Sequence, residues 1–194
     1  MNKKEKPQTR KMVLGAILTA LVVILQMMGA FIKLGPFSIS LVLIPIVIGA
    51  ATCGVGISAW LGFVFGVVVL ASGDAGAFLA VDAIGTVITV LLKGTLAGFL
   101  SALTYKALEK HNKVLATIAA AVVCPVTNTG VFLIGCLLFF METIASWAEA
   151  ADLGANVGQY MIVVLVGLNF LFELGTNIIL SPIVVRLLDI RKKM

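Results

Sequence analysis

The sequence is poor in charged residues and in the side chains on which most enzymes depend. Only 12% of its 194 residues are charged, whereas a typical soluble domain carries about 25%. It contains one histidine and three cysteines, and it has no polar segment long enough for a soluble catalytic domain. These shortages exclude a soluble globular enzyme.

Motifs for nucleotide hydrolysis, metal binding and intramembrane hydrolysis are also missing. Without a GxxxxGK[ST] loop the chain cannot by itself hydrolyse ATP through a P-loop. Cys53, Cys124 and Cys136 are scattered in apolar sequence, so they are expected to be small packing residues rather than metal ligands or disulfide partners. His111 lies in a basic turn, where a solvated side chain is expected. We therefore predict no enzymatic activity, no metal and no cofactor.

Hydrophobic residues make up 61% of the chain. A run of about 20 apolar residues is long enough to cross the ~30 Å hydrocarbon core of a bilayer. The run over residues 38–72 is about twice that length, and Gly54 and Gly56 are the natural place for a turn that divides it. The sequence predicts an all-α membrane protein, with six transmembrane helices in one compact bundle and a single membrane domain over residues 1–194. The predicted helices cover residues 12–31, 38–53, 56–72, 83–105, 114–141 and 159–186.

The positions of the basic residues predict the orientation of these helices. Most of them fall in the N-terminal tail, in the loop after the fourth helix and at the C-terminus: Lys3, Lys4, Lys6, Arg10, Lys11, Lys106, Lys110, Lys113, Arg186, Arg191, Lys192 and Lys193. Six helices with both termini cytoplasmic place all of these inside and only Lys33 outside, which is a strong positive-inside bias. The net charge of +5 thus indicates topology rather than nucleic-acid binding.

The last apolar run carries three polar residues at intervals of four. Asn169, Glu173 and Asn177 drift only ~80° around a helix, so they form one stripe. An ionisable group such as Glu173 is costly in lipid and indicates a functional site that faces the bundle interior. Asn177 lies deeper than the other two, toward the cytoplasmic side.

Polar residues from three other helices reach the depth of Asn169 and Glu173. Lys93 lies roughly 15 Å from the outer end of its helix, and Asn128 and Gln26 rise to a similar level from the cytoplasmic side. Their convergence predicts a pocket for a small polar molecule. Lys93 would offer a positive charge to a carboxylate, while the amides offer both donors and acceptors.

Each of these residues also has a purely structural alternative. Lys93 and Glu173 would then form an ion pair that locks the fourth helix against the sixth, and Asn128 and Gln26 would bond other helices. Pro125 removes a backbone donor, so residues 123–130 are expected to be irregular and to line a cavity or be buried in protein.

Ala16 and Ala20 in the first helix form a pattern of small residues four apart. Such a pair makes a flat strip on which another helix can pack closely. The partner helix belongs either to this chain or to another protein.

Together these features resemble the substrate-binding S-components of energy-coupling-factor (ECF) vitamin transporters. The resemblance covers essentially the whole chain and rests on its size, the six helices with both ends inside, and four stretches of sequence. These are the pair Ala16 and Ala20, residues 43–50, residues 127–130 and residues 169–177. Within the family the chain looks most like the pantothenate type.

The resemblance implies both partners and a site. The partners would be a membrane T-component, whose coupling helices contact Ala16 and Ala20, and two ATPase subunits. The pocket would lie toward the outer face of the bacterial cytoplasmic membrane, between the fourth, fifth and sixth helices. The loops over residues 32–40 and 73–82 would cover it. The function so implied is high-affinity capture and transport of a small water-soluble vitamin, with pantothenate the leading candidate.

Two other functions remain open at this point. The chain could be a self-sufficient carrier of a small organic anion, coupled to protons through Glu173, although 194 residues without a detectable repeat are few for a carrier built of two halves. It could also be a membrane scaffold in which the polar residues only hold helices together.

Overall fold

The computed structural model describes residues 7–29, 33–34, 37–38, 41–151 and 156–193. This part of the chain is almost entirely helical. The longer helices are α1 (Pro7–Gly29), α2 (Leu43–Thr52), α3 (Val55–Ala71), α5 (Ala83–Leu108), α6 (Lys113–Phe139), α7 (Met141–Ala150) and α9 (Gly167–Lys193). The short elements are the paired strands β1 (Lys33–Leu34) and β2 (Phe37–Ser38), the one-turn helices α4 (Gly76–Leu79) and α8 (Val157–Tyr160), and a π-helical segment η1 (Met161–Val166).

Among the described residues, four helical segments are long and apolar enough to cross a membrane: Gln8–Gly29, Ala83–Leu108, Lys113–Phe139 and Val157–Arg186. Helices α2 and α3 are apolar but shorter. The ten residues of α2 extend only about 15 Å, half of the hydrocarbon core. The all-helical membrane fold predicted from the sequence is therefore supported, while the count of six crossings stays a prediction.

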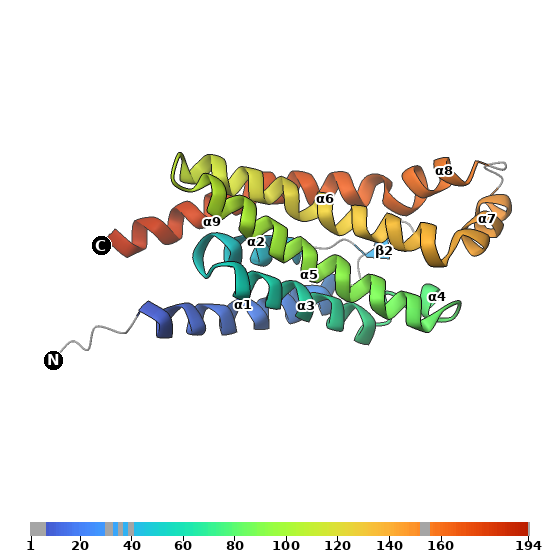
Figure 1. Cartoon of the computed structure of the whole chain (residues 1–194), viewed down its shortest axis with the longest axis horizontal. Helices are drawn as coiled ribbons and strands as arrows, with labels where there is room; N and C mark the ends of the chain where they lie inside the picture. Colours follow the sequence, from blue (N-terminus) through green and yellow to red (C-terminus); the bar gives the residue numbers. More distant parts are fainter. Residues whose placement is uncertain (1–6, 30–32, 35–36, 39–40, 152–155, 194) are drawn as a thin grey trace.

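The long helices run side by side, and their ends fall into two groups (Figure 1). The start of α1, the end of α9 and the turn between α5 and α6 lie at one end of the bundle, and α4, α7 and α8 lie at the other. The exposed residues Lys106, Lys110, His111 and Lys113 lie in the α5–α6 turn or at the helix ends beside it. The bundle therefore groups this basic turn with the ends of the first and last helices, as the positive-inside pattern requires.

The predicted break between residues 53 and 56 is confirmed. Gly54 has φ 98°, a left-handed conformation that glycine adopts without steric cost. It lets α2 fold back against α3. Helix α2 then lies at the centre of the bundle, where Leu43, Ile46 and Val47 are fully buried. The helix begins at Leu43 rather than at the predicted residue 38, so Pro45 falls in its first turn, where a missing N–H costs little.

Helices α3 and α5 pack against each other with almost no side-chain layer between them. A side chain built on Gly62 would collide with the carbonyl oxygen of Gly94, and one built on Gly94 would collide with that of Gly62. The hydroxyl of Ser58 lies 2.9 Å from the Gly98 carbonyl oxygen and 3.1 Å from that of Ile46. Small residues thus let the two backbones touch, as is common between helices in membranes.

Gly94→Ala is expected to lower the melting temperature of the protein in detergent. The added methyl group would meet backbone atoms of α3, which cannot rotate away, and overpacking of this kind costs about 1–3 kcal/mol. Gly130→Ala on α6 is the matched control, because a methyl group there meets nothing within 4 Å. Equal melting temperatures for the two variants would show that the α3–α5 contact does not limit stability.

Two local predictions are wrong. The segment after α6 was expected to be a loop, but it forms α7, because Ile144 and Ala148 bury one face at helical spacing among polar residues. The irregularity expected over residues 123–130 does not occur either, since α6 continues through Pro125. A proline is tolerated inside a membrane helix when neighbouring helices, side chains or local adjustments satisfy the freed backbone carbonyl.

The irregular backbone lies instead at the start of the last helix. Residues Met161–Val166 form a π-helical segment immediately before α9. Such segments inside α-helices are frequent at functional sites because they change the direction of the side chains that follow. Here Leu165, Val166 and Asn169 line one cavity inside the bundle.

Candidate substrate-binding site

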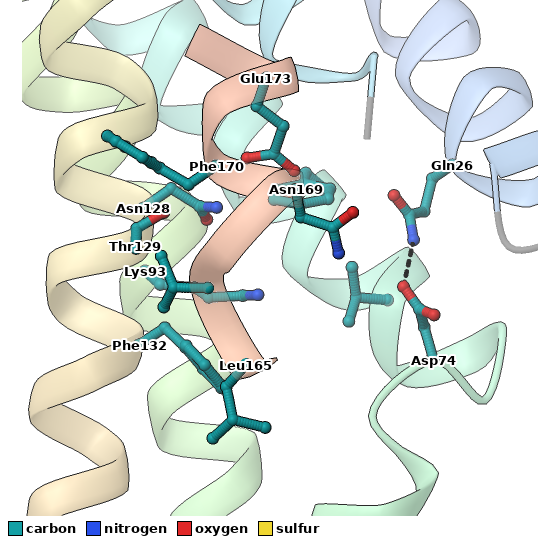
Figure 2. Close-up of a pocket in the computed structure, with 13 residues that line it drawn as sticks. Gln26, Asp74, Lys93, Asn128, Thr129, Phe132, Leu165, Asn169, Phe170 and Glu173 are labelled. Carbon is teal, nitrogen blue, oxygen red and sulfur yellow. Dashed lines mark hydrogen bonds between the residues drawn. The ribbon is translucent and has the colours of Figure 1, made fainter. Parts of the chain in front are cut away.

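One cavity, called the substrate pocket below, lies among the helices of the bundle. Its lining comes from α1, α3, the turn after α3, α5, α6, η1 and α9. The lining residues are Gln26, Phe65, Val69, Asp74, Lys93, Asn128, Thr129, Phe132, Leu165, Val166, Asn169, Phe170 and Glu173. All five residues predicted to bind substrate are among them (Figure 2). The structure thus brings Lys93, Asn128, Asn169, Glu173 and Gln26 to one place, and their role in binding stays a prediction.

Lys93 places its ammonium group between aromatic rings and carboxylates. Its Nζ lies 5.4 Å from the centroid of the Phe132 ring and 5.8 Å from that of Phe65, within the range of cation–π attraction. It also interacts electrostatically with Glu173 and Asp74. The adjacent Gly94 allows the close approach of α5 to α3 that brings Lys93 near Phe65. A ligand at this point would meet a positive group that interacts with two negative ones.

Two amide oxygens in the pocket have no hydrogen-bond partner in the described part of the chain. They are Oδ1 of Asn128, a residue only 7% exposed, and Oδ1 of Asn169, which is half-buried. A buried acceptor without a partner costs about 1–3 kcal/mol, so such atoms are candidates for contact with a bound ligand. Because Asn128 lies on α6 and Asn169 on α9, a donor-bearing ligand between them would bond both helices at once.

Gln26 reaches the pocket from α1 and is 1% exposed. Its Nε2 donates a hydrogen bond to Oδ2 of Asp74 at 3.2 Å (Figure 2). Asp74 is the charged pocket residue that sequence reasoning missed, because it was assigned to a polar outer loop. The signal in the sequence was its place within residues 73–82, the predicted second cover of the site. The other predicted cover, residues 32–40, falls mainly outside the described residues.

The polar residues of the last helix differ in their relation to the pocket, as their depths in the membrane predict. Glu173 is 7% exposed and lines the pocket, whereas Asn177 is fully buried and does not. The amide Nδ2 of Asn177 donates to the Glu173 carbonyl oxygen at 2.9 Å, and Ser181 Oγ lies 3.5 Å from Asn177 Oδ1. Asn177 therefore serves the packing of α9.

Ala16 and Ala20 are exposed on the surface of α1. The internal contact is made by the neighbouring Gly15, where an added side-chain carbon would lie 3.1 Å from Ile57. The exposure of both alanines argues against the interpretation that these two residues pack the bundle internally.

Fold and site together define a multi-pass helical membrane protein with a polar pocket inside its bundle. Residues 10–188 match the family model described as "ECF transporter, substrate-specific component". The match covers most of the chain, and the protein belongs to this family. Searches among curated proteins and among solved structures gave no match.

Membership confirms the resemblance seen in the sequence at the level of the family. The protein is a substrate-binding subunit for transport and not an enzyme, and ATPase activity lies in partner subunits. The family implies partnership with a T-component and ATPases, and uptake of a small molecule. It does not specify which one.

Proposed function

We propose that this S-component captures a small water-soluble vitamin from the outer side of the membrane and delivers it through an ECF module. One observation carries the proposal. Polar residues from separate helices line a single cavity, and two of their amide oxygens have no partner among the described residues. Unsatisfied acceptors are costly in a membrane-embedded bundle, and a ligand with N–H or O–H groups would remove that cost.

Pantothenate is the first candidate, because the chain looks most like the pantothenate type. Its carboxylate would contact Lys93, whose ammonium group carries three donors. Its hydroxyl and amide hydrogens would be accepted by Asn128 and Asn169. Gln26 and Glu173 would complete the binding residues, with Gln26 acting partly through Asp74.

The charge of the pocket favours a second candidate, a vitamin that carries a positive charge. The described lining residues include one ammonium group, that of Lys93, and two carboxylates, those of Asp74 and Glu173. If both carboxylates are ionised, an anionic ligand adds to an excess of negative charge, which is unfavourable at low dielectric. A cationic ligand would balance this charge and could use the faces of Phe132 and Phe170.

Binding of pantothenate, thiamine and riboflavin to purified protein, measured by calorimetry in detergent, tests both candidates. These vitamins are anionic, cationic and neutral. Asn128→Ala is expected to weaken binding of the preferred vitamin about tenfold, because one hydrogen bond in a desolvated site is lost. Gln159→Ala, at an exposed position, should bind as wild type does.

Asp74→Asn separates the two candidates within the same experiment. This isosteric change removes one negative charge, so it should strengthen binding of pantothenate and weaken binding of thiamine. If wild type binds none of the three vitamins, or if Asn128→Ala binds normally, the proposed site is wrong.

The proposal includes the arrangement of the protein in the membrane. We propose six crossings in one domain, with both termini cytoplasmic in a bacterial membrane, and a T-component docked on Ala16 and Ala20. The start of α1, the end of α9 and the basic α5–α6 turn lie at the same end of the bundle, which supports this orientation. The exposure of both alanines supports the docking site.

A further inference from the structure

A second cavity adjoins the substrate pocket and differs from it in chemistry. Its lining residues are Val69, Asp74, Ala75, Phe78, Thr86, Thr89, Val90, Lys93, Phe132 and Phe140. Four of these, namely Val69, Asp74, Lys93 and Phe132, also line the substrate pocket. We call this second cavity the apolar compartment, because rings and aliphatic side chains dominate its walls.

The walls of the apolar compartment are held together by aromatic contacts. The ring of Phe78 meets those of Phe132, Phe140 and Trp147 edge to face, at centroid distances of 5.7, 4.9 and 5.4 Å. Such pairs add about 0.5–1.5 kcal/mol each beyond the area they bury. Phe78 thereby joins α4 to α6 and α7 at the end of the bundle away from the termini.

Among the polar residues of these walls, Thr89 is only 4% exposed, and its Oγ1 has no hydrogen-bond partner in the described regions. Threonines in helices usually donate to the carbonyl four residues earlier. Thr86, Thr95 and Thr104 on the same helix do so, at 2.6, 2.7 and 2.9 Å. Thr89 therefore differs from the other threonines of α5, because its buried hydroxyl does not bond to a carbonyl of its own helix. This hydroxyl could bond to a ligand.

Gly135 on α6 accommodates this side chain. A Cβ atom at position 135 would collide with Thr89, so glycine is needed for α6 to approach α5 at this level. The compartment therefore combines apolar walls, one unsatisfied hydroxyl and an opening toward Lys93 and Asp74.

From these observations we propose that the apolar compartment is a second part of the substrate site. It receives a small apolar group of the vitamin that ends in one hydrogen-bonding atom, and this atom bonds to the Thr89 hydroxyl. The polar part of the same molecule remains beside Lys93, between Asn128 and Asn169. The substrate class is thus an amphipathic vitamin that spans both cavities, and this inference rests on the proposed function.

The test compares Thr89→Val with Thr95→Val, using whichever of pantothenate, thiamine and riboflavin binds wild type. Both changes replace a hydroxyl by a methyl group, but only Thr89 lines the compartment, while Thr95 is already bonded to Leu91. We expect Thr89→Val to bind about tenfold more weakly, and Thr95→Val to bind as wild type does.

A second variant, Ala75→Leu, fills the compartment from the turn after α3. We expect it to weaken binding by about tenfold or more, provided its melting profile shows a folded protein. Wild-type affinity in Thr89→Val, or in folded Ala75→Leu, would overturn the compartment proposal. Failure of wild type to bind any of the three vitamins would instead contradict the proposed function.

Discussion

Lys93→Ala is expected to weaken vitamin binding by about 30- to 1,000-fold, the largest effect of any single change in the pocket. The estimate follows from the loss of a charge-assisted hydrogen bond, and of one partner in a buried charge pair, together worth about 2–4 kcal/mol. This expectation holds for a carboxylate ligand. A cationic ligand would gain from the removal of the ammonium group, so the sign of the effect reports the charge of the substrate.

The same change is expected to destabilise the protein. Without Lys93, the carboxylates of Asp74 and Glu173 lose the positive group with which they interact, and removing one partner of a buried charge pair costs about 3–5 kcal/mol. The double variant Lys93→Ala/Glu173→Gln removes one charge of each sign. It should recover much of the melting temperature without recovering the affinity for an anionic vitamin.

Calorimetry with each vitamin and melting curves of the wild type and both variants would separate these contributions. If the double variant regains both stability and affinity, Lys93 only balances Glu173 and does not contact substrate. The ion-pair alternative would then be correct for this lysine.

Ala16→Leu and Ala20→Leu are expected to reduce uptake by cells about tenfold or more, while binding to the purified protein stays unchanged. Both alanines are exposed on α1. A leucine at either position would project from the strip on which a helix of the T-component is proposed to dock, and overpacking of a close contact costs about 1–3 kcal/mol. The bundle itself should tolerate the change, because both positions are exposed.

The matched control is Ala83→Leu, an exposed alanine at the start of α5. It introduces the same side chain at the opposite end of the bundle, so uptake should remain at the wild-type level. Loss of vitamin binding in Ala16→Leu or Ala20→Leu would mean that these residues pack the bundle, contrary to their exposure. Normal uptake in both would remove them from the T-component interface.

Much of the site could be predicted without coordinates, because polar side chains at membrane depth are costly. Lys93, Asn128 and Glu173 were conspicuous in apolar runs, and counting residues from the helix ends gave them a common depth. Depth alone, however, does not give the direction of a side chain around its helix. Packing decided that Asn169 and Glu173 line the pocket while Asn177 bonds to its own helix.

Residues outside the apolar runs were harder to predict. Asp74 carries no such signal, because an acidic residue in a loop is ordinary. Its approach to Gln26 depends on how the turn after α3 folds back toward α1. Helix α7 was also hard to predict from the sequence, since only two of its residues are buried.

The sequence by itself determined that this chain is a helical membrane protein of the S-component type, since the length of its apolar runs and its motifs do not depend on three-dimensional contacts. Only the tertiary structure decided the composition of the site. Helix α5 approaches α3 through glycines, Asp74 joins Lys93 and Glu173, and an apolar compartment opens beside them. The physical reason is that cavities and charge balance arise where helices from distant parts of the chain meet, and periodicity along one helix contains no information about its neighbours.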